Sequence, residues 1–79
     1  YDGRRNDMTK KTVYFIAYYG EHHFWWDNDK KRFVPAGMRL YRTTWDDLGE
    51  ALKAIHRVKH DYATGWADDI YLDSELTVA

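Results

Sequence analysis

The side chains best suited to chemistry in this sequence are its four histidines. His56 and His60 stand four residues apart, a spacing that places two imidazoles on one face of a helix and can hold one metal ion. His22 and His23 offer two more ligands. Zinc sites need a third and a fourth ligand, however, and no H-E-x-x-H arrangement is present. The sequence therefore predicts solvated histidines, with no metal ion and no other cofactor.

Paired carboxylates are the second feature that could carry chemistry. General acid–base catalysis needs two carboxyl groups with separated pKa values that face one substrate. Asp46 and Asp47 stand where the start of a helix favours negative charge. Asp68 and Asp69 border a strand, where they can form an acidic contact patch. The chain has no cysteine, and Ser74 lacks a G-x-S-x-G context. These patterns predict a protein that is not an enzyme.

Basic residues interleaved with aromatic residues are typical of nucleic-acid binding. Residues 1–42 hold nine Lys/Arg against five Asp/Glu, and residues 43–79 hold three against eight. The basic half also contains most of the aromatic side chains. The sequence pI of about 6.4 is low for a nucleic-acid-binding domain. The two halves can instead attract each other within the fold, so both interpretations stay open.

Length and composition indicate the kind of protein that carries these residues. The chain has 79 residues, of which 44% are hydrophobic, and a net charge of -1, which indicates one folded domain. It has no apolar run long enough to span a bilayer, and we expect a cytoplasmic protein. Residues 1–11 are polar and lack periodicity, so we expect a flexible arm followed by a single domain over residues 12–79.

The patterns predict three strands, a helix and a final strand. Alternation and aromatic content favour strands at residues 12–19, 23–26 and 38–42. A stripe of apolar residues indicates a helix that begins at a Thr44 cap and ends at a left-handed Gly65. A period of two returns after Trp66. We therefore expect an α+β fold of βββαβ order, with a four-stranded antiparallel sheet and the helix packed on one face.

A single helix covers only one face of such a sheet, so the other face is expected to be open. The core beneath the helix is then predicted to contain Val13, Phe15, Ala17, Phe24 or Trp26, Met38, Leu40, Ile70 and Leu72. The open face is predicted to carry Tyr14, Ile16, Tyr18, Trp25, Arg39, Tyr41 and Tyr71. Tyrosine, tryptophan and arginine are enriched at interaction hot spots, which favours a binding role for this face.

Two sequence stretches carry a resemblance to known proteins. They are V-Y-F-I-A-Y-Y…F-W-W-D-N-D-K-K and M-R-L-Y-R-T-T-W-D-D-L-G-E-A-L-K-A-I, followed by a closing strand. Together they resemble the small uncharacterised phage and prophage accessory proteins of βββαβ form. The resemblance implies a protein that binds and blocks a host protein or a defence complex such as a CRISPR effector. The acidic residues of the second half would then imitate nucleic-acid phosphates; they are Asp61, Asp68, Asp69, Asp73 and Glu75.

The sequence thus predicts a protein-binding module that acts without catalysis. Its partner is expected to be a host or defence protein, and a homodimer is a further possibility. A module that binds single-stranded nucleic acid is the alternative. The predicted contact residues are Tyr14, Tyr18, Trp25, Arg39, Tyr41, Tyr71, Asp68 and Asp69.

Overall fold

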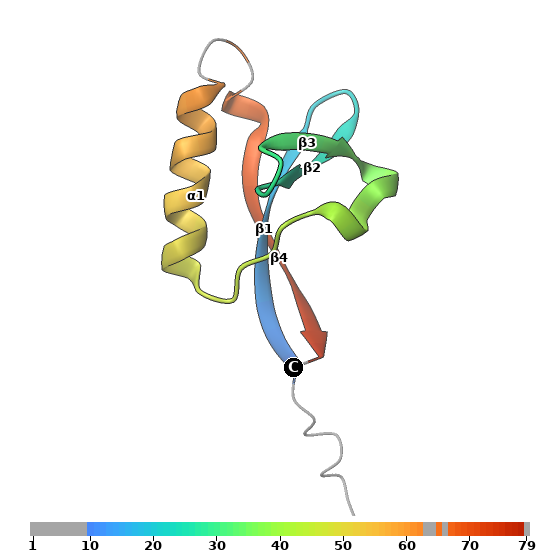
Figure 1. Cartoon of the computed structure of the whole chain (residues 1–79), viewed down its shortest axis with the longest axis vertical. Helices are drawn as coiled ribbons and strands as arrows, with labels where there is room; N and C mark the ends of the chain where they lie inside the picture. Colours follow the sequence, from blue (N-terminus) through green and yellow to red (C-terminus); the bar gives the residue numbers. More distant parts are fainter. Residues whose placement is uncertain (1–9, 63–64, 66, 79) are drawn as a thin grey trace, which may run out of the picture.

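A computed structural model describes residues 10–62, 65 and 67–78 and shows a four-stranded sheet with one long helix beside it (Figure 1). The elements are β1 (Lys10–Tyr19), β2 (His23–Asp27), β3 (Arg32–Pro35), the 3-10 segment η2 (Ala36–Tyr41), α1 (Leu48–Asp61), the 3-10 turn η3 (Ala67–Asp69) and β4 (Ile70–Val78). The strands are ordered β3-β2-β1-β4, and all neighbours are antiparallel. The predicted α+β class, with an antiparallel four-stranded sheet and one helix, is confirmed.

β1 and β4 form the longest ladder of the sheet, and β4 lies at one edge. Their register runs from Lys10 opposite Val78 to Tyr18 opposite Ile70. β1 therefore begins at Lys10 and includes two residues that the sequence assigned to the flexible arm. The rest of that predicted arm, residues 1–9, lies outside the described residues.

The third strand differs from the prediction. β3 ends at Pro35, and the predicted strand over residues 38–42 is mostly the 3-10 segment η2. Proline cannot donate to a ladder, so pairing stops there. In η2, Leu40 is 98% exposed and Met38 is also exposed. Both were wrongly predicted to lie in the core.

The helix is shorter than predicted at both ends. Asp47 is its N-cap, because its side chain accepts a hydrogen bond from the backbone N–H of Glu50. The predicted Thr44 cap is therefore wrong. The helix ends at Asp61, and Gly65 does not take the left-handed conformation that was expected of it.

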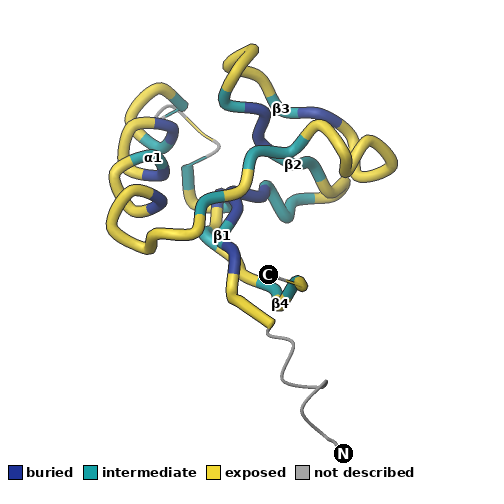
Figure 2. Tube along the Cα trace, turned by 60° about the horizontal axis from the view of Figure 1, so that its bottom comes forward, coloured by how far each residue is buried: buried dark blue, intermediate teal, exposed yellow. Residues whose placement is uncertain are grey.

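The core under α1 is built mainly from the even-numbered residues of β1, β2 and β4. Ile16, Trp26 and Ile70 pack there against Ile55 and Val58 of the helix. Figure 2 shows the buried residues of α1 on the side that faces the sheet. We call this side of the sheet the helix face; it also carries Tyr14, Tyr18, Phe24, Phe33 and Leu72, by the strand registers.

The odd-numbered residues of β1 lie on the opposite side, which we call the far face. Val13, Phe15 and Ala17 are there and not under the helix, so the predicted assignment of the two β1 faces is inverted. The alternation itself is as expected. Both sides of β1 are apolar, so the alternation in β1 does not show which side faces α1. The pairing with β4 shows it, because Ile16 and Tyr18 lie opposite Leu72 and Ile70.

The far face is only partly open. The guanidinium of Arg42 lies 4.0 Å from the centroid of the Phe15 ring, and the Trp25 ring meets Phe15 edge-on at 5.4 Å. Phe15 is buried beneath these contacts, and Val13 and Ala17 on the same side of β1 are buried as well. The expectation of a wholly uncovered face is therefore wrong, because the segment that follows β3 folds back over part of it.

The turn between β2 and β3 is organised by a buried carboxylate. Asp27 is 4% exposed, and its Oδ1 accepts hydrogen bonds from the backbone N–H groups of Asp29 and Lys30. Arg32 faces the other oxygen at 3.9 Å. These bonds compensate the burial of the charge and hold the end of β2 in place.

Candidate functional site

Four rings gather on the far face where β1, β2 and β4 meet. The Tyr19 ring stacks with Tyr71 at 5.8 Å between centroids and meets His23 edge-on at 5.1 Å and Trp25 edge-on at 6.4 Å. We call Tyr19, His23, Trp25 and Tyr71 the aromatic cluster. Tyr71 is 47% exposed and His23 is exposed, so the cluster offers ring surface to the solvent.

Hydrogen bonds fix two of these rings. The Tyr19 hydroxyl donates to Oδ2 of Asp73 at 2.6 Å, and Nε1 of Trp25 donates to the backbone carbonyl of Ala36 at 2.9 Å. Burial raises the pKa of Tyr19 to about 12, together with the hydrogen bond to Asp73 and the negative charge of that carboxylate. The two hydrogen bonds therefore restrict the orientations of the Tyr19 and Trp25 rings.

A charged triad lies on the same face. Nη2 of Arg39 and Nη2 of Arg42 each lie 2.5 Å from an oxygen of Glu75. Hydrogen bonds from Arg39 and Arg42 hold the pKa of Glu75 below its ordinary value. Since Arg39 lies in η2 and Arg42 directly follows it, the triad ties this segment to β4.

The structure splits the predicted contact residues between the two faces. Trp25 and Tyr71 come together in the aromatic cluster, and Arg39 joins the same face through Glu75. Tyr14 and Tyr18 lie on the helix face, where both are half-buried. The prediction that they share one surface with Trp25 is therefore wrong, and the inverted parity of β1 is the reason.

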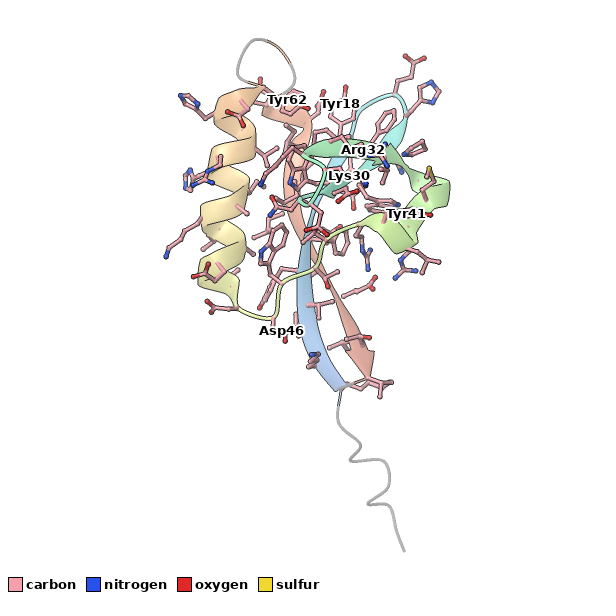
Figure 3. The ribbon with its side chains drawn as sticks, viewed as in Figure 1. Tyr18, Lys30, Arg32, Tyr41, Asp46 and Tyr62 are labelled. Carbon is pink, nitrogen blue, oxygen red and sulfur yellow. The ribbon has the colours of Figure 1, made fainter. Side chains whose placement is uncertain are left out.

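The remaining predicted contact residues lie in the short 3-10 elements. Tyr41 projects from η2 and is 54% exposed (Figure 3). Asp68 and Asp69 form the turn η3 just before β4. Of the other acidic residues of the second half, Asp73 and Glu75 are already bonded within the chain, which weakens the expectation that they imitate phosphates.

Sequence reasoning missed Tyr19 and His23 as cluster members. Tyr19 has the same parity as Phe15 and Ala17, so alternation alone places it with Trp25 once the register is known. His23 was considered only as a metal ligand. Its position opposite Tyr19 at the start of β2 was the available clue.

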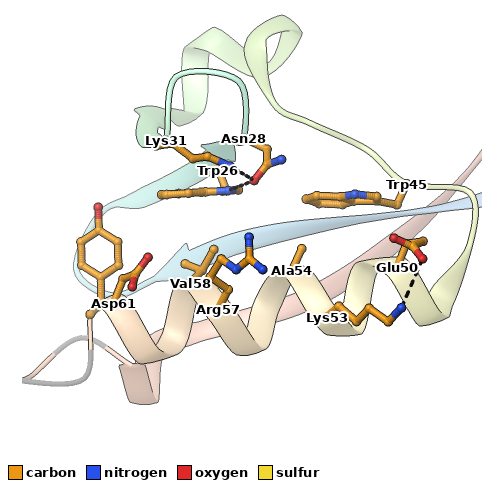
Figure 4. Close-up of a pocket in the computed structure, with 11 residues that line it drawn as sticks. Trp26, Asn28, Lys31, Trp45, Glu50, Lys53, Ala54, Arg57, Val58 and Asp61 are labelled. Carbon is orange, nitrogen blue, oxygen red and sulfur yellow. Dashed lines mark hydrogen bonds and ion pairs between the residues drawn. The ribbon is translucent and has the colours of Figure 1, made fainter.

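A groove between α1 and the sheet is a second candidate site (Figure 4). Its volume is about 730 Å³, and Trp26, Trp45, Ala54 and Val58 form its apolar part. The size suits a small ligand.

Several polar residues of the groove bond to one another. Nε1 of Trp26 and Nζ of Lys31 both donate to Oδ1 of Asn28, and Glu50 lies 3.6 Å from Lys53. Arg57, Asp61 and Tyr62 also line the groove. We regard the aromatic cluster as the stronger site, because its rings touch one another and are partly exposed.

Neither a cluster of metal ligands nor a membrane-spanning helix is present among the described residues. Over residues 10–62, 65 and 67–78, no three His, Asp or Glu side chains come together as potential metal ligands. In the same part of the chain, no helix combines the length and the apolar character that crossing a lipid bilayer requires.

Comparisons with known proteins give no match. Neither the models of protein families, nor the curated proteins, nor the solved structures contain one that is significantly similar to this chain. The function must therefore be argued from the site alone.

Proposed function

We propose that this protein is a binding module for another protein and that the aromatic cluster is its contact surface. The observation that carries the proposal is the arrangement of Tyr19, His23, Trp25 and Tyr71 as one set of touching, partly exposed rings. Large rings with few torsions give contact area at a low cost in side-chain entropy. Such residues dominate the binding energy of many protein interfaces.

Preorganisation supports this assignment. Tyr19 and Trp25 are each held by a hydrogen bond as well as by ring contacts. A surface that is already ordered loses less conformational freedom on association. Asp73 and Glu75 follow Tyr71 on the same face of β4, and both carboxylates are already bonded within the chain, so an incoming protein meets no unpaired carboxylate there.

Single-stranded nucleic acid is the less favoured ligand. Tyr71 is 47% exposed, but phosphate binding also needs cations near the rings. Arg39 and Arg42, which share this face, both bond to Glu75. A steep loss of oligonucleotide affinity with added salt would support this alternative over ours. The resemblance to phage inhibitors of host or defence proteins stays a hypothesis about which protein is bound.

The test compares two tyrosines of similar exposure. Tyr71→Ala removes a cluster ring, whereas Tyr41→Ala removes a tyrosine from η2. We expect Tyr71→Ala to weaken binding by roughly tenfold or more, since truncating a hot spot costs about 2 kcal/mol. Tyr41→Ala should change affinity by less than about threefold.

The partner is first captured from a lysate of the native host and then purified for calorimetry with each variant. Equal affinity for the wild type and Tyr71→Ala would show that the cluster is not the contact surface. A partner that the immobilised wild type and the immobilised Tyr71→Ala variant capture equally well would also contradict the proposal.

A further inference from the structure

β4 forms one edge of the sheet, and within the described residues only β1 pairs with it. On the other side of β1, Tyr14 exchanges two backbone hydrogen bonds of 2.8 Å with Trp45. The N–H and C=O of Tyr14 therefore point away from β4. In an antiparallel ladder, the residue opposite, Ser74, also turns its backbone groups outward. The same holds for Leu76 and Val78, so these residues offer backbone donors and acceptors to a further strand.

The charged side chains of β4 do not protect the end of this edge against pairing with another strand. Natural edge strands commonly carry charges that repel another strand. In β4, Asp73 is bonded to Tyr19, and Glu75 is bonded to Arg39 and Arg42. Both carboxylates are thus drawn over the far face and partly neutralised within the chain.

The outward backbone groups of β4 are not equally accessible along the edge. Oδ1 of Asp73 accepts a hydrogen bond from the backbone N–H of Ser74 at 2.8 Å, which occupies one outward amide. Beyond it, no side chain among the described residues bonds to the outward amides of Leu76 and Val78, which are 67% and 66% exposed. An exposed apolar strand end with free backbone groups is a template for strand addition.

We propose that this edge pairs with the same edge of a second copy, antiparallel about a two-fold axis at Leu76. In that register Leu76 faces its counterpart, Val78 faces Ser74 and Glu75 faces Thr77, so no carboxylate faces another. An axis at Glu75 would oppose two glutamates, and an axis at Ser74 would oppose Asp73 and Glu75. Like charges directly across a ladder are destabilising, so the charges favour the register at Leu76 over the registers at Ser74 and Glu75.

A two-fold axis of this kind runs perpendicular to the sheet. The two sheets then continue into one, and both aromatic clusters lie on the same side of it. This interface uses other residues than the proposed protein-binding surface, so either proposal can fail without the other.

The test is the mass of the full chain by sedimentation equilibrium up to roughly 1 mM, since an interface this small gives a weak dimer. We expect twice the mass of the single chain at the highest concentrations. Leu76→Lys sets two ammonium groups against each other across the axis. It should raise the dissociation constant by about tenfold or more.

Leu40→Lys is the matched control, because it makes the same change at an exposed leucine of η2. It should leave the dimer unchanged, as should Tyr71→Ala. Thermal unfolding followed by circular dichroism verifies that each variant folds. A chain that stays monomeric at every concentration overturns the proposal. So does a dimer that Leu76→Lys leaves intact or that Leu40→Lys weakens equally.

Discussion

At the scale of single residues, Arg42 behaves as a core residue although it is charged. Its side chain is 7% exposed and lies over the Phe15 ring, and its guanidinium bonds to Glu75. The cation–π contact and the ion pair together compensate the loss of hydration. Arg39 bonds to the same carboxylate, but its side chain is 57% exposed. The two arginines therefore share a partner and differ in burial.

This difference gives a stability prediction. Arg42→Ala should lower the free energy of unfolding by about 2 kcal/mol or more, because it uncovers Phe15 and removes a buried contact. Arg39→Ala should cost less than about 1 kcal/mol, as exposed ion pairs usually do. Urea denaturation of the two variants measures both values. Equal losses would mean that the Glu75 bond, and not the burial of Arg42, determines the effect.

Glu75 also predicts a dependence of stability on pH. Its pKa in the folded protein is lowered from 4.5 by the two arginines. A lowered carboxyl pKa stabilises the folded state above the unfolded pKa, and this stabilisation is lost as the pH falls toward the folded pKa. The advantage of the wild type over Glu75→Gln should thus be constant near pH 7 and shrink below about pH 4.5. Urea denaturation at several pH values tests this. A difference in the free energy of unfolding between the wild type and Glu75→Gln that grows in acid would contradict it.

At the scale of elements, the start of α1 can be tested directly. Asp47→Ala removes the side chain that accepts the Glu50 N–H and should cost about 1 kcal/mol. Thr44→Ala, at the position that the sequence pattern favoured as the cap, should change stability by less than about 0.5 kcal/mol. Thermal unfolding of both variants distinguishes the two caps. A larger loss for Thr44→Ala would restore the original assignment.

Local patterns predicted which elements exist better than where they end. The alternation of β1 and β4 and the apolar stripe of α1 identified these elements correctly, since each depends on residues close in sequence. The third strand was misplaced because the residues of η2 also alternate in polarity. Pro35 was the local sign that pairing stops before that segment.

At the scale of the whole molecule, the aromatic cluster could be predicted only in part. Trp25 and Tyr71 were identified, but the choice of face for β1 depends on long-range pairing with β4. Because Ile16 and Phe15 are similarly apolar, nothing local distinguishes the two sides of that strand. Arg42 reaches Phe15 only after the chain has turned through η2, which no short-range pattern encodes.

The alternation of β2 places two adjacent tryptophans in different surroundings. Trp26 lies on the helix face and is 3% exposed, whereas Trp25 belongs to the far face. Their indole rings are therefore natural fluorescent reporters for opposite sides of one sheet. In a protein that keeps only Trp25, a ligand on the far face would shift the emission spectrum. In a protein that keeps only Trp26, the same ligand would leave the spectrum unchanged, while loosening of α1 would move it to longer wavelengths.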